Sequence, residues 1–534
     1  MYAGYATAAR RLSTYTATME SSLPFVPVYR AAAVRAADLA AQRDHGLPGR
    51  ALMRAAAAAA LTDLQGRWPN ARHLLVVCGA GNNGGDGYDV ATLAGAAGLR
   101  VSLVALAAPE HLSGDALLAA QDWQATGGVA LPAAELPAAL AAAEIVVDAL
   151  LGTGLSRPVV GAWAEVIEAV NAAGKPVLSI DVPSGMDANS GAVLGTAVRA
   201  EFTSTFVGWK AGLFLNPGLA GQVRLHTLDV PLAAFPKESQ PLLWQLPRQT
   251  LAGLPRRARD AHKGRHGHVV VVGGDVGMPG AVRLAGEAAL RSGAGRVTVL
   301  TRAEHAAAVV AGCSELMARA AEVGAELVAQ LAGADVMVCG PGLGRNDWGS
   351  ALLAGVIGAA AGRPVVLDAD ALVLLAAVPQ RLGAAFMLTP HPGEAAKLLG
   401  VSVATVQADR VGAVRALVER FGATVVLKGA ATLTLGHEMA VPVACELGNP
   451  GMGTAGMGDV LAGVCAALAG QDVCDPAWGY ARRAAAGWAG VAALAVLTHA
   501  AAGDLAAAQH GERGLLASDL FPHLRAVLNG REQA

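Results

Sequence analysis

The stretch from Gly448 to Gly463, GNPGMGTAGMGDVLAG, places a glycine-rich loop directly before an apolar run that continues to Leu468. Glycines in such a loop expose backbone amides, and the apolar run predicts that a helix begins where the loop ends. Because the first amides of a helix have no partner inside the helix, this arrangement can bind an anion. The stretch therefore predicts a phosphate site followed by a helix.

Asp459 lies at the predicted helix start, where its carboxylate would repel a bound phosphate unless it had a separate task. The task that fits is removal of a proton from an attacking hydroxyl, while the amides and a metal ion hold the charge of the transferring phosphoryl group. The alternative is that Asp459 is an ordinary N-cap on a glycine-rich turn. No GxxxxGK[ST] pattern occurs in the chain, so the phosphate is not bound by a P-loop.

Length and charge narrow the class of protein. With 534 residues the chain is long enough for two large or three modest domains. The 40 basic and 42 acidic residues nearly balance, so we expect neither a nucleic acid nor a membrane as partner, but a small molecule. The six cysteines form no CxxC pair, which is typical of buried thiols in a reducing compartment, here the cytoplasm.

Two segments resemble targeting or membrane segments. Ala484 to Gly503 carries no charge, but its content of Ala, Gly, Thr498 and His499 favours a buried helix over a membrane span. Residues 1–22 contain Arg, Ser and Thr with almost no acidic residue, which loosely resembles a transit peptide, but no apolar segment follows. We expect residues 1–22 to be a disordered leader or the result of a start codon placed too far upstream.

The α/β pattern of the first half opens with a β-branched strand, His73 to Cys78, and a run of glycines. Gly79-x-Gly81-x-x-Gly84 formally matches the dinucleotide fingerprint. However, the next predicted strand has no acidic residue where a ribose-binding carboxylate belongs. This disfavours an ordinary hydride-transfer site.

The loop after this first strand instead offers Asn82, Asn83 and Asp86 to a polar ligand or a cation. Two later strands also end in polar residues, namely Asp148 and Asp181, the latter followed by Ser184 and Asp187. Ligands bind beyond the carboxyl ends of the strands in an open parallel sheet, so we expect the three loops to converge on one crevice. Taken singly, each aspartate is better explained as a helix cap or an Asx turn. A further strand ends at Lys210.

The second half repeats the α/β pattern. Residues 235–259 carry prolines and charges without periodicity and predict a linker. A strand, a glycine turn, a helix and another strand follow, which predicts a second parallel sheet with right-handed crossovers. The last predicted strand, Val425 to Thr434, turns at Gly436 to Glu438 into a hairpin. The fold class is therefore α/β with two domains.

The motifs GAGNNGGDG at 79–87, VDALLGTGL at 147–155 and SIDVPSGMD at 179–187 together resemble the N-terminal domain of the bifunctional NAD(P)H-hydrate repair enzymes. The resemblance covers residues 23–246. It implies a Rossmann-like three-layer αβα domain that epimerises the R and S forms of NADH and NADPH hydrated at the nicotinamide ring. The alternative is a binding module that has kept the pocket and lost the chemistry.

The same resemblance implies positions for the ligands of this domain. Asp181 would be catalytic, with Lys210 as a second candidate for the proton path. Oxygen ligands from an amide, a carboxylate and a hydroxyl suit a hard monovalent ion, and the resemblance implies K⁺ at Asn83, Asp148 and Ser184. The implied substrate contacts are Asn82, Asn83, Gly84, Gly85, Asp86, Gly152, Thr153, Gly154, Leu155, Ser156, Arg157, Pro158 and Asp181.

In the second half, GPGLG, TPHPGE, KGAAT and GNPGMGTAGMGD occur in order and resemble the ADP-dependent NAD(P)H-hydrate dehydratases of the ribokinase-like family. The resemblance covers about residues 248–528 and implies a ribokinase-like αβα domain, for which we expect bounds of 247–534. It also implies that this domain dehydrates the S form, with ADP as co-substrate, Mg²⁺ at the phosphates, and AMP and phosphate as products. Relatives more often have glycine where this chain has Ala455. If this position needs a positive φ, alanine is less favourable there than glycine because of its Cβ.

The dehydratase resemblance assigns the remaining site residues. Catalysis falls to Asp459, which would deprotonate the ring hydroxyl. His391 has an alternative explanation as a turn residue beside two prolines, and Lys428 as a solvated strand end. The implied nucleotide contacts are Lys428, Gly429, Ala430, Ala431, Thr432 and Gly458, and the implied contacts to hydrated nicotinamide are Ala281, Gly342, His391 and Asp459.

A different function is also compatible with these residues. A ribokinase-like kinase for a small alcohol, fused to a nucleotide-binding module without epimerase activity, would use the same phosphate loop and base. The residues alone do not decide between ADP and ATP, because one backbone cradle can hold either. We expect a homo-oligomer, although the Ala-rich helical faces suit packing inside one chain equally well.

Overall fold

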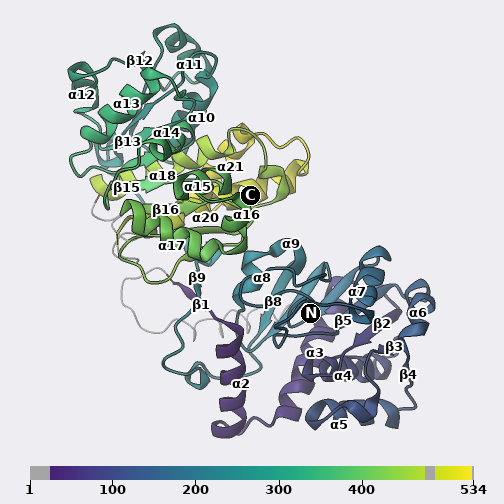
Figure 1. Ribbon diagram of the computed structural model, residues 1–534. Coiled ribbons are helices and arrows are strands. Elements are labelled where there is room, and N and C mark those ends of the chain that lie inside the picture. The colour runs from purple at the N-terminus through teal and green to yellow at the C-terminus, as the bar shows by residue number, and fades with distance from the viewer. Residues whose placement is uncertain (1–23, 476–486, 532–534) are drawn as a thin grey trace. The chain divides into compact units, whose positions relative to one another are not determined.

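The computed structural model describes residues 24–475 and 487–531, so the predicted leader lies outside the described part. The chain forms two compact units. The first runs from Pro27 to Leu243, and the second takes in Val26 and the chain from Trp244 onward. Each unit has its own β-sheet (Figure 1). The predicted α/β fold with two domains is therefore confirmed.

The sheet of the first unit has seven strands in the order β4-β3-β2-β5-β6-β7-β8. All neighbouring strands are parallel, and the order reverses direction between β2 and β5, as in a Rossmann fold. The strands are β2 (His73–Cys78), β3 (Arg100–Ala105), β4 (Ala130–Leu131), β5 (Ile145–Ala149), β6 (Val177–Ile180), β7 (Phe202–Phe206) and β8 (Gln222–His226).

Helices cover both faces of this sheet, because its strands are apolar on both sides. Along β2, Leu74 and Val76 pack in the core cluster that contains residues of α3, α4 and α5. Leu75 and Val77 point the other way and pack with α6 and α7. The helices are α2 (Ala31–Asp44), α3 (Gly49–Arg67), α4 (Asn82–Ala96), α5 (Gly114–Ala125), α6 (Leu136–Ala142), α7 (Ala162–Ala172), α8 (Ala211–Leu215) and α9 (Pro217–Ala220).

The second sheet has eleven strands in the order β1-β9-β18-β17-β16-β15-β14-β13-β10-β11-β12. From β12 to β16 every pairing is parallel, and the order reverses direction between β10 and β13. The strands are β1 (Val26–Val28), β9 (Leu243–Gln245), β10 (His268–Val272), β11 (Arg296–Thr301), β12 (Met317–Ala320), β13 (Val336–Cys339), β14 (Val365–Leu367), β15 (Phe386–Leu388), β16 (Thr424–Leu427), β17 (Thr432–Leu435) and β18 (Val443–Cys445).

Two strand predictions need correction. Val425 to Thr434 is not one strand, because residues 428–431 form a turn between β16 and β17, which pair antiparallel. The predicted hairpin after it is confirmed as the antiparallel pair β17 and β18. The stretch predicted as a linker contributes a strand, since β9 pairs with β18. Short strands of this kind carry no periodicity that a sequence could reveal.

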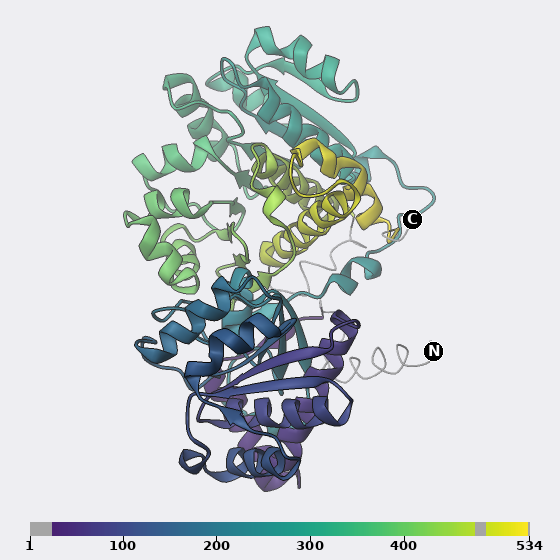
Figure 2. The ribbon, with the colours of Figure 1, turned by 90° about the vertical axis from the view of Figure 1, so that its right-hand side faces the viewer.

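Two long apolar helices, α18 and α20, lie side by side with α10 and α21 in the second unit (Figure 2). Both are long and apolar enough to cross a membrane, but 78% of each apolar window is buried inside the unit. The expectation of a buried helix is thus met for the described residues from Trp488 to Gly503. The helices are α10 (Pro279–Arg291), α11 (Ala306–Gly312), α12 (Ala325–Leu331), α13 (Asp347–Gly358), α14 (Asp370–Ala377), α15 (Pro392–Leu399), α16 (Val403–Ala408), α17 (Arg410–Phe421), α18 (Met457–Cys474), α20 (Trp488–His510) and α21 (Leu520–Leu528).

Helices α10 and α18 approach each other at Gly463. A Cβ at this position would lie 2.1 Å from the carbonyl oxygen of Ala285, so Gly463→Ala must push the helices apart. We expect Gly463→Ala to destabilise the protein by roughly 1–3 kcal/mol, which a shift of the urea midpoint would report. Gly470→Ala on the same helix is the matched control, because its Cβ would meet nothing closer than 3.5 Å. That control should be neutral or stabilising by up to about 1 kcal/mol, and equal midpoints for the two variants would contradict the prediction.

Candidate functional site

Three loops of the first unit meet at a cavity of about 840 Å³ beyond the carboxyl ends of β2, β5 and β6. The cavity lies where the strand order reverses, which is the position at which open α/β sheets bind their ligands. The structure therefore brings most of the predicted substrate residues together. Those that line the cavity are Asn82, Asn83, Asp86, Gly152, Thr153, Gly154, Leu155, Ser156, Arg157 and Asp181.

Asn82 to Asp86 were expected in a loop, but they form the first turns of α4. Glycine allows this helix to lie against the strands, because a Cβ at Gly84 would be 2.1 Å from the carbonyl oxygen of Gly79. A Cβ at Gly85 would be 2.9 Å from the sulfur of Met53. Gly84 and Gly85 therefore serve close packing and do not line the cavity. Pro158 is exposed and does not line it either.

Asp181 faces the cavity and forms an ion pair with the buried Lys210. The ammonium group of Lys210 also donates to Thr205 Oγ1 at 3.0 Å and to the carbonyl oxygen of Phe206 at 2.7 Å. Asp181 has a φ of 66°, which is strained for a residue with a side chain. Such strain persists where the surrounding contacts fix the conformation, and here the contacts hold the Asp181 carboxylate at the cavity wall.

Asp86 provides a second carboxyl group in the same cavity. Burial raises the pKa of Asp86 well above its usual range, and the negative charge of Asp181 raises it further. The cavity thus holds a carboxyl group with a raised pKa beside an ion-paired carboxylate. Two acids in such different environments suit general acid–base chemistry.

The three predicted cation ligands surround one loop. Asp148, at the end of β5, accepts hydrogen bonds from Ser184 Oγ at 2.5 Å and from the Ser184 amide at 2.9 Å. Ser184 Oγ also accepts from the Leu151 amide at 2.8 Å. Gly152 lies against the side chain of Asn83, whose amide nitrogen is buried and has no partner among the described residues. Asn83, Asp148 and Ser184 therefore converge on residues 150–152.

In the second unit, the predicted contacts Ala281 and Gly342 also lie at the reversal of strand order. Gly342 follows β13 and has a φ of 54°, and a Cβ there would be 3.2 Å from the Cβ of Ala281 on α10. Leu284, on the same helix, lies against Gly456 at the start of α18. The structure thus brings Ala281 and Gly342 together, and it places α10 beside the predicted phosphate loop.

The glycine loop before α18 ends at Gly456, which is the N-cap residue and has a φ of 91°. Ala455 does not have a positive φ, so alanine at this position causes no backbone strain. The loop is anchored to α20, because Asp504 accepts hydrogen bonds from the amide of Gly448 and the side chain of Asn449. No side chain caps α18, so its first amides are free to bind an anion.

Asp459 is the third residue of α18 and forms no hydrogen bond or ion pair with a described residue. It is therefore not the N-cap of the helix, which rules out the alternative reading of this residue. Burial raises the pKa of Asp459 to about 7, and the negative charge of Asp368 contributes to the increase. A half-buried carboxylate with free lone pairs and this pKa is suited to accept a proton.

Lys428 lies next to Asp459 and is not a solvated strand end. Its ammonium group donates to Asp368 Oδ1 at 2.8 Å and lies 3.9 Å from Glu394 Oε2. Although burial alone lowers the pKa of Lys428, the carboxylates of Asp368 and Glu394 raise it, so the group stays charged. A Cβ at Gly458 would be 3.1 Å from Lys428 Nζ, which places the predicted nucleotide residues Lys428 and Gly458 in contact.

Arg410 stabilises the turn from Lys428 to Ala431 through hydrogen bonds. The guanidinium of Arg410 donates to the carbonyl oxygens of Lys428 at 3.3 Å and Ala431 at 2.7 Å. Thr432 Oγ1 donates to the carbonyl oxygen of Gly429 at 3.2 Å. Gly429 and Ala430 are exposed, whereas the side chain of Ala431 is buried, so Ala431 is able to offer a ligand only its backbone.

His391 is the N-cap of α15, as its alternative reading as a turn residue implied. Its Nδ1 accepts hydrogen bonds from the amides of Gly393 at 2.9 Å and Glu394 at 3.3 Å. Burial lowers the pKa of His391, and the charge of Lys428 lowers it further. Nε2 lies 3.5 Å from Glu394 Oε1, and the side chain is more than half exposed.

Sequence reasoning missed two residues of this site. Asp368 is buried and accepts hydrogen bonds from Lys428 and Thr389. Its negative charge helps to raise the pKa of Asp459. Its position at the end of β14 is the signal by which it could have been found. Arg410 carried no such signal, because it lies in an amphipathic helix and its partners are backbone carbonyl groups.

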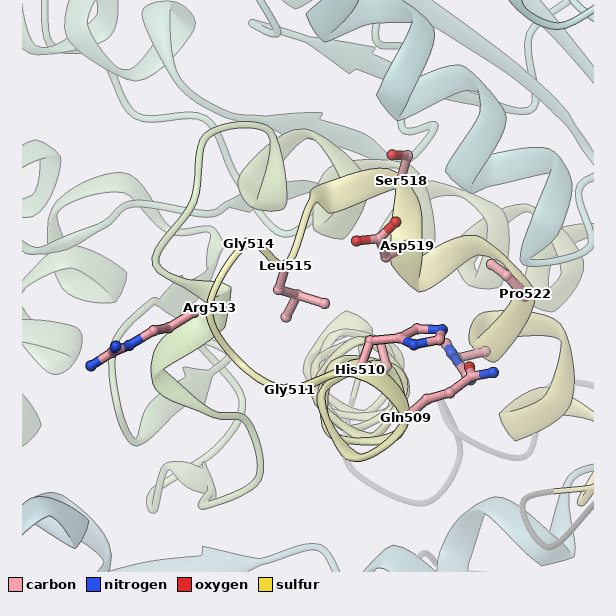
Figure 3. Close-up of a pocket in the computed structure, with 11 residues that line it drawn as sticks. Gln509, His510, Gly511, Arg513, Gly514, Leu515, Ser518, Asp519 and Pro522 are labelled. Carbon is pink, nitrogen blue, oxygen red and sulfur yellow. The ribbon is translucent and has the colours of Figure 1, made fainter.

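A smaller cavity of about 220 Å³ lies between the end of α20 and the start of α21 (Figure 3). His510, Arg513 and Asp519 belong to its wall, which contains none of the predicted site residues. Glu512, in the segment between the two helices, lies against Gly451 of the glycine loop, but neither residue lines the cavity. Asp459, Lys428 and Asp368 do not line it either.

The fold and the two sites define a two-domain α/β enzyme with a cavity at a Rossmann-type switch point in one domain and, in the other, a helix start that no side chain caps. Residues 49–212 match the model of the YjeF-related protein N-terminus, and residues 269–525 match the model of NAD(P)H-hydrate dehydratase. The chain belongs to the family of bifunctional NAD(P)H-hydrate repair enzymes.

Relatives of this family match almost the whole chain. The chain is 43% identical to the bifunctional NAD(P)H-hydrate repair enzyme Nnr of Coxiella burnetii, over 91% of this chain and 96% of the relative. It is 39% identical to the Escherichia coli enzyme of the same name, over 90% and 89%. The ADP/ATP-dependent NAD(P)H-hydrate dehydratase of Bacillus subtilis, crystallised with ATP and Mg²⁺, aligns with 54% of this chain at a TM-score of 0.45 and 25% identity, covering 98% of that chain.

Proposed function

We propose that this protein repairs hydrated NADH and NADPH. The first domain interconverts the R and S forms of the hydrate, and the second dehydrates the S form with ADP, giving AMP and phosphate. The observation that carries the proposal is Asp459, a carboxylate free of hydrogen bonds at the start of α18, beside the pair of Lys428 and Asp368. The relatives named as bifunctional repair enzymes support the choice of substrate.

In the proposed dehydration, Asp459 takes the proton of the ring hydroxyl, and the hydroxyl oxygen attacks the terminal phosphorus of ADP. The bond between that phosphorus and AMP breaks, so AMP leaves and a phosphate ester forms on the ring. The ester then loses phosphate, together with a ring proton, which restores the double bond. Lys428 and the amides of the first turn of α18 stabilise the charge of the transferring group.

The kinase reading shares the first of these steps and differs in the fate of the ester. A stable alcohol would accumulate as a phosphorylated product, whereas the ester of a hydrated nicotinamide breaks down. In the first domain, the ion pair of Asp181 and Lys210 and the raised pKa of the nearby Asp86 support catalysis over mere binding. We propose that these three groups relay the proton of epimerisation.

The donor sets fit the two metal ions that we propose. Asn83, Asp148 and Ser184 offer amide, carboxylate and hydroxyl oxygens around residues 150–152, which suits K⁺. No group of three His, Cys, Asp or Glu side chains in the described part of the second domain forms a metal site. That agrees with Mg²⁺, which binds through substrate phosphates, water and one or two carboxylates. Asp368, whose Oδ2 faces Gly458, would hold it.

We further propose that the protein acts in the cytoplasm as a homo-oligomer. All six cysteines are free thiols, which is expected in a reducing compartment.

The proposal is tested by the recovery of reduced-nicotinamide absorbance when an epimeric mixture of NADH hydrate meets the protein with ADP, Mg²⁺ and K⁺. We expect recovery of nearly all the mixture, faster than spontaneous epimerisation allows. Recovery of one epimer only would reduce the first domain to a binding module. Stable phosphorylation of an alcohol, without any recovery, would favour the kinase reading.

The role of Asp459 predicts a loss of turnover without a loss of binding. We expect Asp459→Asn to lower dehydration at least about a hundredfold, the lower range for general base catalysis, and to leave the dissociation constant of ADP nearly unchanged. Because the carboxylate must be deprotonated, the rate of the parent protein should rise with pH around a midpoint near 7, the pKa of Asp459. Asp347→Asn, an exposed residue with the same change of charge, is the control. Normal turnover in Asp459→Asn would refute the assignment.

The proposed K⁺ site predicts a response to the cation in both stability and activity. Replacing K⁺ by Li⁺ at constant ionic strength should slow epimerisation and lower the melting temperature of the first domain. A ligand at a hundred times its dissociation constant stabilises a fold by about 2.7 kcal/mol. Ser184→Ala should reduce the melting shift caused by K⁺, whereas Ser190→Ala, an exposed serine nearby, should keep it. Indifference of the parent protein to the exchange would contradict the site.

A further inference from the structure

A large cavity in the second domain lies away from the proposed catalytic residues. It has a volume of about 870 Å³ and lies between the segment from Leu251 to Arg257, the C-terminal ends of α10 and α21, and Gln471 on α18. Gln471 is about three helical turns beyond Asp459, or roughly 18 Å along α18. None of the residues proposed to bind nucleotide or substrate lines this cavity.

The wall of the cavity is strongly basic and contains no acidic residue among those that the structure describes. No described residue forms an ion pair with Arg256, Arg525 or Arg531, and only Arg291 has a carboxylate partner, Glu287 at 3.2 Å. Like charges gathered around one cavity repel one another, so an anion in it would be bound favourably. The arginines of the wall are Arg256, Arg257, Arg291, Arg525 and Arg531.

One of these arginines is held in a fixed position. The Nη2 of Arg257 donates to the carbonyl oxygen of Gly293 at 2.5 Å and to Gln471 Oε1 at 2.9 Å. Gly293 has a φ of 100°, and a Cβ there would lie 2.4 Å from Arg257 Nη2, so glycine makes the room that the guanidinium occupies. Because both acceptors are uncharged, they fix the position of the Arg257 guanidinium without neutralising its charge.

Ser292 is a second, independent sign of a ligand. It lines the cavity and is 2% exposed, and its hydroxyl has no hydrogen-bond partner in the described part of the chain. Buried hydroxyl groups are normally satisfied, so an unpaired one beside a cavity indicates a missing oxygen or nitrogen atom. The Gln471 side chain donates to the carbonyl oxygen of Ser292 at 3.0 Å and fixes the backbone there.

The chemistry of the wall indicates what the ligand is. Arginine guanidinium groups bind phosphate through paired hydrogen bonds, and several of them match more than one phosphate group. Leu251, Leu254, Leu290 and Leu528 supply an apolar surface in the same cavity, which suits the flat face of a base. The volume lies in the range of small-molecule sites. We propose that this cavity binds a phosphorylated ligand of the nucleotide class, at a site separate from the nucleotide turn at Lys428.

Titration calorimetry of the full chain with inorganic tripolyphosphate tests the phosphate part of the proposal. We expect the parent protein to bind one molecule at the cavity in addition to any bound at the glycine loop. Arg256→Ala combined with Arg525→Ala should weaken that binding at least about tenfold, because two charged contacts are lost. Both residues are exposed, so the double variant should fold. Arg319→Ala, an exposed arginine outside the cavity wall, is the matched control, and equal isotherms for the double variant and this control would overturn the proposal.

Two further measurements test the site more closely. Ser292→Ala removes an unpaired hydroxyl, so it should leave the melting temperature of the free protein unchanged and reduce the increase that tripolyphosphate causes. An unchanged increase in melting temperature would overturn the role of Ser292.

The second measurement is a titration with ADP, in which the parent protein and Arg319→Ala should show one more binding site than the double variant. The same stoichiometry in all three would overturn the nucleotide class of the ligand.

Discussion

Helix α18 lies against α10 at a separation that only glycine at position 463 permits, and the second domain depends on this contact. The helix follows its N-cap Gly456, where the glycine loop ends, and its third residue is Asp459. At its other end, Gln471 forms part of the basic cavity. Because a packed helix is stiff, the close approach at Gly463 determines where both ends lie. The same device operates in the first domain, where Gly84 lets α4 approach β2 and presents Asn83 to the cavity.

Both sites use a buried lysine paired with an aspartate at the end of a parallel strand. Lys210 pairs with Asp181 after β6, and Lys428 pairs with Asp368 after β14. In each site a further carboxyl group close by has a raised pKa, Asp86 in the first and Asp459 in the second. Burial is the main cause of both raised pKa values; the aspartate of each pair raises the pKa further, and the lysine of the pair opposes the increase.

Much of this arrangement was predictable from the sequence, because strands that alternate with glycine turns and helices place their loops at one edge of a sheet. That argument correctly brought Asn82, Asp86 and Asp181 to one cavity and put Asp459 at a helix start. It did not reveal that the chain turns back at Lys428. The turn depends on Arg410, whose bonds to the loop carbonyls arise only in the folded chain.

Asp368 shows a different limit of sequence reasoning. The motif LDADAL contains two aspartates, and which of them faces the site depends on Ala369 between them, whose φ is 49°. A positive φ at alanine is not predictable from residue type, since glycine is the residue that normally adopts it. The basic cavity is a further example, because its arginines come from three distant segments and the overall charge of the chain is nearly balanced.

The distinction between a kinase and a dehydratase lies in the acceptor and not in the phosphate site. A hydroxyl on a carbon next to a ring nitrogen becomes a good leaving group once it is phosphorylated, because the nitrogen lone pair expels the phosphate. The second step therefore needs little catalysis by the protein. In the proposed mechanism, the unpaired carboxylate of Asp459 would serve the first step. A dehydratase selective for one epimer of the hydrate leaves the other epimer unrepaired. An epimerase site in the same chain removes that limit, which agrees with an acid and a base group in each domain.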